Sequence, residues 1–138
     1  MSETPADYIP PRNNDGWGST EPRTCNATIR STMLGVEDHG ILTCMIHLDY
    51  GGGGQGFGGY AFDRYLKDFD RRQGTAWGME FIRCVLDTLK IEQWEKLPGT
   101  PVRVVTTHTK VLKIGHFIEE RWFDPSDLGT LFDLDKTP

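Results

Sequence analysis

The residues with the clearest potential for chemistry are the seven glycines among the nine residues from Gly51 to Gly59. Within that run, Gly54-Gln-Gly56-Phe-Gly-Gly59 fits the spacing G-x-G-x-x-G, in which glycines admit a pyrophosphate to bare backbone where a helix begins. The residues that follow, 60–65, have the pattern of a strand, and no Lys-Ser or Lys-Thr pair follows as in a phosphate-binding loop. We therefore expect no nucleotide cofactor here, nor any other cofactor.

Two interpretations of the glycine run remain. One is a long hairpin loop with bulges. The other is a binding loop, in which backbone N–H groups and flanking aromatic rings contact a protein partner or a small anionic, nucleotide-like ligand. The contact residues that we expect are His47, Asp49, Tyr50, Gly54, Gln55, Gly56, Phe57, Gly58 and Tyr60.

His47 and Asp49 suggest a second chemistry, because residues two apart in a strand share one face. With His108 or His116 they would supply the three ligands of a metal-assisted hydrolase, which is our alternative function. The chain has no H-E-x-x-H pattern and no cluster of Cys and His, so we expect no metal site. The turn at residues 37–40 could form an acid–base pair, but such side chains usually bond to the local backbone.

We predict no catalytic residue. The serines lack the Gly-x-Ser-x-Gly context of a nucleophile. Cys44 falls on the apolar face of a strand and Cys84 lies within a helix, which favours inert packing. With Cys25 they are three widely spaced cysteines, as expected of reduced thiols in a cytosol.

The charge of the chain bears on its partners. A net charge of −5 and a pI near 5.3 argue against a phosphate backbone as ligand, so a nucleic-acid accessory protein is the weaker alternative. The cations within 63–72 alternate with aspartates, which is typical of a solvated loop. Neither a membrane-spanning run nor a secretory signal is evident, so we expect a cytoplasmic protein without a membrane partner.

The elements that must position these residues follow from periodicity. Residues 27–36 read as a strand, and residues 41–50 alternate strictly. Residues 60–65 resume as a strand, which predicts a long hairpin with the glycines at its tip. The apolar face of the second strand comprises Leu42, Cys44, Ile46, Leu48 and Tyr50.

Thr75 reads as the N-cap of a helix over residues 76–90. Its apolar stripe comprises Gly78, Ile82, Val85, Leu86 and Leu89. A helical turn over 91–97 and a second hairpin, 102–107 with 111–118, complete the pattern.

These elements predict an α+β fold: a mainly antiparallel sheet of about five strands (β-β-β-α-β-β) packed on one principal helix. Residues 1–24 are rich in Pro, Asn and Gly and read as an extended N-terminal arm, which suggests a homo-oligomer. Residues 25–126 form the single domain, and residues 127–138 an acidic C-terminal tail.

The chain resembles a family of small hypothetical proteins encoded by bacteriophages and prophages. The resemblance covers residues 27–126 and rests on seven segments: 34–43, 47–50, 55–60, 74–82, 94–99, 114–117 and 122–125. It implies a phage origin and no residue roles. Small phage proteins without a catalytic constellation are often binders, so we expect a non-enzymatic protein, located in the host cytosol, that antagonises a host factor or an antiviral defence.

Overall fold

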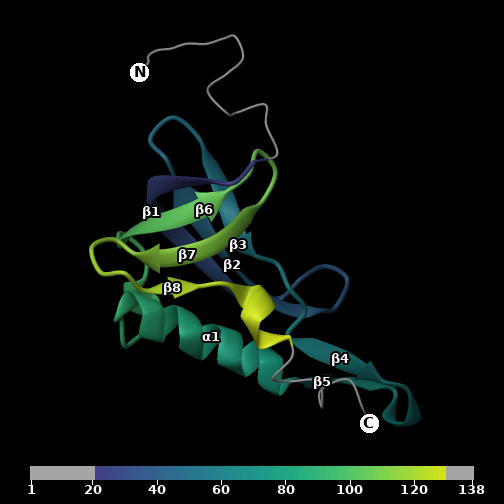
Figure 1. Cartoon of the computed structure of the whole chain (residues 1–138). Coiled ribbons are helices and arrows are strands. Elements are labelled where there is room, and N and C mark those ends of the chain that lie inside the picture. The colour runs from purple at the N-terminus through teal and green to yellow at the C-terminus, as the bar shows by residue number, and fades with distance from the viewer. Residues whose placement is uncertain (1–20, 130–138) are drawn as a thin grey trace.

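A computed structural model describes residues 21–129 (Figure 1). Six strands form one antiparallel sheet in the order β3-β2-β1-β6-β7-β8. Their bounds are β1 (Arg23–Val36), β2 (Leu42–Asp49), β3 (Gly54–Gly58), β6 (Pro101–Thr106), β7 (Val111–His116) and β8 (Trp122–Phe123). A separate two-stranded hairpin contains β4 (Asp63–Leu66) and β5 (Arg71–Gly74), joined by the 3₁₀ turn η1 (Lys67–Phe69). The predicted α+β class is confirmed.

The long strand β1 bends the sheet. Its first half pairs with β6, from Arg23 opposite Thr106 to Thr28 opposite Pro101. Its second half pairs with β2, and the register shifts between Ile29 and Ser31. Such a bulge increases local twist. The sheet curls until β3 lies against β7, without a backbone ladder between them.

The order and direction of the strands match a known barrel topology. A meander of three strands is followed by a helix and then by a hairpin whose first strand pairs with β1. Each pairing in the sheet is antiparallel, so β3 and β7 run in the same direction. This is the connectivity of the OB-fold, a partly open five-stranded Greek-key barrel. Strand β8 and the β4–β5 hairpin are additions to it.

Helix α1 (Ala76–Leu89) covers one end of the barrel (Figure 1). Thr75 is its N-cap, as predicted, and accepts a hydrogen bond from the Gly78 N–H at 3.0 Å. Phe81 is fully buried and stacks at 5.6 Å between centroids on Phe57 of β3. The short turns η2 (Trp94–Lys96) and η3 (Pro125–Leu128) flank this core.

The apolar stripe of α1 differs from the prediction. Its buried residues are Gly78, Phe81, Val85, Thr88 and Leu89. Ile82 and Leu86, which we had placed toward the core, remain partly exposed at its border. The bulk of Phe81 rotates the buried face, because this ring fills the centre of the aromatic cluster with Phe57 and Phe123.

The predicted long hairpin is wrong in its second strand. The glycines themselves form β3, with Asp49 opposite Gly54 and Met45 opposite Gly58. Residues 60–62 belong to no strand, and β4 pairs with β5 outside the main sheet. The second hairpin, β6 with β7, is confirmed.

Two predicted boundaries also shift. Strand β1 begins at Arg23, inside the predicted N-terminal extension of residues 1–24. Leu128, within the predicted tail, is buried in η3. The remainder of both segments, 1–20 and 130–138, lies outside the described residues. Within residues 21–129, no helix is long and apolar enough to cross a membrane.

Candidate functional site

The tip between β2 and β3 is a tight turn at Gly51–Gly53. The Tyr50 N–H donates to the Gly53 carbonyl at 2.8 Å, and Gly51 has a φ of +101°. The Asp49 carboxylate accepts the Gly51 N–H at 2.8 Å. Asp49 therefore stabilises the turn, and fewer bare amides face solvent than the sequence suggested.

Strand β3 alternates between glycine and a larger residue. Phe57 is fully buried, so we correct its assignment as a contact residue: its ring belongs to the core. The glycines at 54, 56 and 58 face outward. A Cβ at Gly58 would lie 2.5 Å from the Cys44 carbonyl oxygen, and one at Gly54 would clash with the Leu48 carbonyl oxygen. Gly54 and Gly58 are thus required by the close approach of β3 to β2.

Gln55 closes the open side of the barrel with its side chain. Its Nε2 donates to the Thr107 and His108 carbonyls at 3.2 and 3.3 Å. Its Oε1 accepts from the hydroxyls of Tyr50 at 2.5 Å and Thr106 at 2.6 Å. These bonds occupy both ends of the amide, so Gln55 holds β3 to the β6–β7 turn and the Tyr50 hydroxyl supports it.

The outer surface of β1, β2 and β3 forms a surface that we call the barrel face. The register aligns Ser31, His47 and Gly56 across the three strands, and Met33 with Met45 beside them. The Met45 thioether covers Gly56, where a Cβ would lie 2.6 Å from its sulfur. Of the nine expected contact residues, five lie on this face: His47, Asp49, Gly54, Gly56 and Gly58.

The barrel face carries cationic groups at two places. Arg30 is exposed at the bulge of β1. Sequence reasoning did not single out Arg30, although it follows the buried Ile29 and so falls on the outer side by alternation. At the border, the Lys110 ammonium lies 5.6 Å from the centroid of the Tyr60 ring. Tyr60 packs edge-on against Trp77 at 5.5 Å, which fixes its orientation.

The metal-binding residues that we had considered do not come together. Within residues 21–129, the only group of three potential ligands is Glu37, Asp38 and His39, all in one surface turn. The Nδ1 of His116 instead accepts from the Ile118 and Glu119 amides, at 3.1 and 3.0 Å. The geometry therefore offers no support for a hydrolase that uses His47 and Asp49.

The turn at residues 37–40 has the local role that we expected. The Glu37 carboxylate accepts the backbone N–H groups of His39 and, at 3.3 Å, Ile41. Partial burial alone would raise the pKa of Glu37, but these amides and the His39 ring stabilise the carboxylate and lower it overall. The Glu37 carboxylate therefore stabilises the turn.

Two of the thiols are poor nucleophiles. Burial raises the pKa of Cys44 to about 12. Burial and the nearby Glu80 carboxylate also raise the pKa of Cys84. Since the thiolate is the reactive form, both residues act as packing groups, as the sequence indicated.

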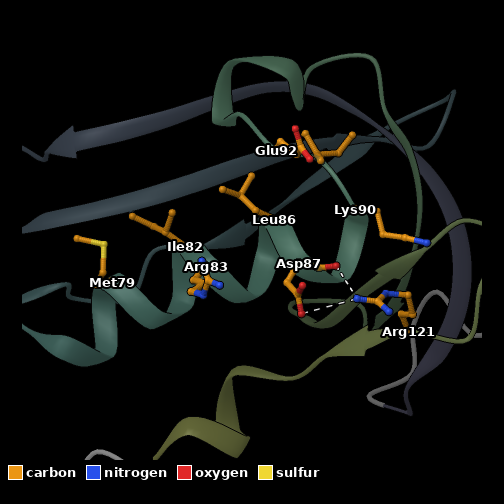
Figure 2. A pocket seen from close by; sticks show the side chains of 9 residues that line it. Met79, Ile82, Arg83, Leu86, Asp87, Lys90, Glu92 and Arg121 are labelled. Atoms are coloured by element: carbon orange, nitrogen blue, oxygen red, sulfur yellow. Dashed lines mark hydrogen bonds and ion pairs between the residues drawn. The ribbon is translucent and has the colours of Figure 1, made fainter.

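A separate groove runs along the outer side of α1 and has a volume of about 860 Å³ (Figure 2). Met79, Ile82 and Leu86 supply its apolar surface. At its end, the Arg121 guanidinium donates to the Asp87 carbonyl at 2.8 Å and lies 3.7 Å from the Asp87 carboxylate. The sequence missed this groove because it assigned Ile82 and Leu86 to the core.

Comparison with known proteins gives no relative for this chain. No protein family, no curated protein and no solved structure matches it.

Proposed function

We propose that this protein is a non-enzymatic binding protein whose barrel face binds single-stranded nucleic acid. The connectivity of the barrel carries the proposal. In OB-folds, the outer side of the second and third strands, with adjacent loops, binds oligonucleotides and oligosaccharides. Here the same strands carry His47, Met45 and the glycines of β3. Connectivity alone does not specify a ligand, so the chemistry of the face must also fit.

The chemistry of the barrel face suits a single strand. Proteins hold such strands with cations along the backbone and with aromatic side chains beneath the bases, and thioethers also make favourable contacts with aromatic rings. Arg30 and His47 can meet phosphates, and the thioethers of Met33 and Met45 lie next along the same two strands, on the side of His47 away from Arg30. Gly54 and Gly56 are exposed beside them on the same face.

The negative net charge, which made nucleic acid the weaker alternative, is concentrated elsewhere. Five acidic residues but only two basic ones lie outside residues 21–129: Glu3, Asp7, Asp15, Asp133 and Asp135, with Arg12 and Lys136. The described residues therefore carry less than half of the net negative charge. The barrel face itself carries Arg30 and His47 with one exposed carboxylate, that of Asp49, which is bonded to the Gly51 amide.

The test is fluorescence anisotropy of the full chain with a labelled single-stranded oligothymidylate over a range of salt. We expect binding that weakens as salt rises, and affinity for a duplex at least about tenfold lower. Arg30→Ala should weaken binding several-fold and reduce the salt slope by about 0.7. The control is Lys96→Ala, which removes an exposed cation from η2, outside the barrel face. No salt-dependent binding by the wild-type chain at low salt would contradict the proposal.

The groove along α1 favours a second candidate, which the resemblance to phage proteins also motivates. This candidate is a host protein, bound so as to antagonise a host factor or defence. An amphipathic segment could place apolar side chains against Ile82 and Leu86. In affinity purification from host lysate, Leu86→Arg should lose a protein that the wild type and Arg30→Ala both retain. Identical captured proteins for all three would argue against this candidate.

A further inference from the structure

The β4–β5 hairpin, which we call the arm, comprises residues 63–74. Figure 1 shows that it extends away from the barrel beside the N-terminal end of α1. Its four paired positions run from Asp63 opposite Gly74 to Leu66 opposite Arg71. The arm is thus a short β-ribbon outside the main sheet, and contacts at its base must hold it in place.

The base of the arm is fixed to the first residue of β2. The Phe62 N–H donates to the Leu42 carbonyl at 2.7 Å, and the Leu42 N–H donates to the Asp63 carboxylate at 3.1 Å. Arg72 reaches the same carboxylate at 2.9 Å. Burial alone would raise the pKa of Asp63, but Arg72 and the Leu42 amide lower it overall. The arm therefore begins where β2 of the barrel face begins.

The outer part of the arm exposes aromatic rings and cations in alternation. Tyr65 is 53% exposed and Phe69 is 73% exposed, although both are large apolar side chains. Asp70 accepts the Tyr65 hydroxyl at 2.6 Å, which orients the ring. Lys67 and Arg71 are exposed, and neither forms an ion pair with a described residue. The fold itself gains little from these four side chains.

We propose that the arm is a second contact for single-stranded nucleic acid, continuous with the barrel face. The rings of Phe69 and Tyr65 stack with bases, while Lys67 and Arg71 neutralise phosphates. Aromatic platforms interleaved with cations are what sequence-tolerant binding of single strands requires. A strand that leaves the barrel face at the start of β2 meets the arm directly, since Asp63 is bonded there. This inference rests on the proposed function.

The experiment compares arm variants of the full chain in the same anisotropy titration with labelled oligothymidylate. Phe69→Ala should weaken binding about tenfold, and Phe69→Tyr should restore it, because stacking needs only an aromatic face. Arg71→Ala should lower the salt slope by about 0.7, whereas Phe69→Ala should leave the slope unchanged. The matched control is Ile118→Ala, which removes a side chain that is 79% exposed beyond β7.

The outcomes separate the two proposals. If the wild-type chain does not bind the oligonucleotide, the proposed function fails and this inference fails with it. If Arg30→Ala weakens binding but Phe69→Ala and Arg71→Ala do not, the barrel face stands and the arm inference is overturned. It is also overturned if the arm variants lose binding only to anionic lipid vesicles, since the arm would then contact a membrane surface.

Discussion

Two hairpins follow one another in the chain, β2–β3 and the arm. In each of them the role that the sequence indicates differs from the one that the structure shows, and the two differences are opposite. The β2–β3 hairpin looks functional in sequence because of its glycines, yet Gly54 and Gly58 are required by strand packing and Phe57 is core. The arm looks like a solvated loop, yet it presents Phe69 and Tyr65 to solvent on an ordered ribbon. Unusual composition can therefore report a packing constraint, while ordinary composition can carry exposed chemistry.

The largest expected effect is the loss of the buried ring in β3. Phe57→Ala should lower the free energy of unfolding by about 3–5 kcal/mol, because it leaves a cavity among the rings of Phe81 and Phe123. Urea unfolding followed by circular dichroism measures this change. A loss below about 1 kcal/mol would mean that Phe57 is not a core residue. The contrast between a buried ring in β3 and exposed rings in the arm would then be wrong.

The next effect concerns the outward glycines. Gly58→Ala should cost about 1–3 kcal/mol of unfolding free energy, since Gly58 has a φ of +126° and its Cβ would meet a β2 carbonyl. The matched control is Gly52→Ala at the tip, where no heavy atom lies within 4 Å of the added Cβ. Its expected change is within about 0.5 kcal/mol. Equal effects of the two variants would remove the packing explanation for the glycine strand.

The anchor of the arm should make a smaller contribution, and one that depends on pH. Asp63→Asn should lower the unfolding free energy at neutral pH by about 1 kcal/mol, because it removes the ion pair with Arg72. The pKa of Asp63 is lower in the folded protein, so its carboxylate stabilises the fold above about pH 4 and that contribution is lost as the pH falls further. Denaturation at several pH values should show the wild type and variant converging in acid. A difference in unfolding free energy between wild type and variant that stays the same at every pH would contradict this role.

The smallest expected effect is on the arm itself. Phe69→Ala should change the unfolding free energy by no more than about 0.5 kcal/mol, because the ring is mostly exposed. Thermal unfolding of this variant beside Phe57→Ala gives the comparison directly. A loss of more than about 1 kcal/mol would show that the Phe69 ring is a packing group, and would move the arm into the same class as β3.

Much of the fold could be predicted because local signals agreed with the final packing. The alternation in β2 and the Thr75 cap both survive in the structure. The strand identity of residues 54–58 could not be predicted, because glycine disfavours strands and only the approach to Leu48 and Cys44 requires it there. Pairings between distant residues, such as β1 with β6, leave no local signal either.

The candidate site was only partly predictable for a similar reason. His47 lies on the polar side of β2, where alternation placed it. Arg30 lies on the outer side by alternation with buried Ile29, whereas the bulge brings Ser31 and Met33 onto that same side, because bulges shift the faces that alternation assigns. Nothing in the sequence indicated that Gln55 bonds to a turn more than fifty residues away along the chain, or that Tyr50 donates to Gln55.

The glycine strand has a consequence for the behaviour of the protein in a crowded solution. Unpaired sheet edges are templates on which other chains add strands and begin to aggregate. The β3 edge lies against β7 without pairing to it, and Gly54, Gly56 and Gly58 give an incoming chain no side chains to interlock with. Segments rich in glycine make poor steric zippers. The residues that let β3 pack closely on β2 therefore also protect the seam of the barrel from self-association.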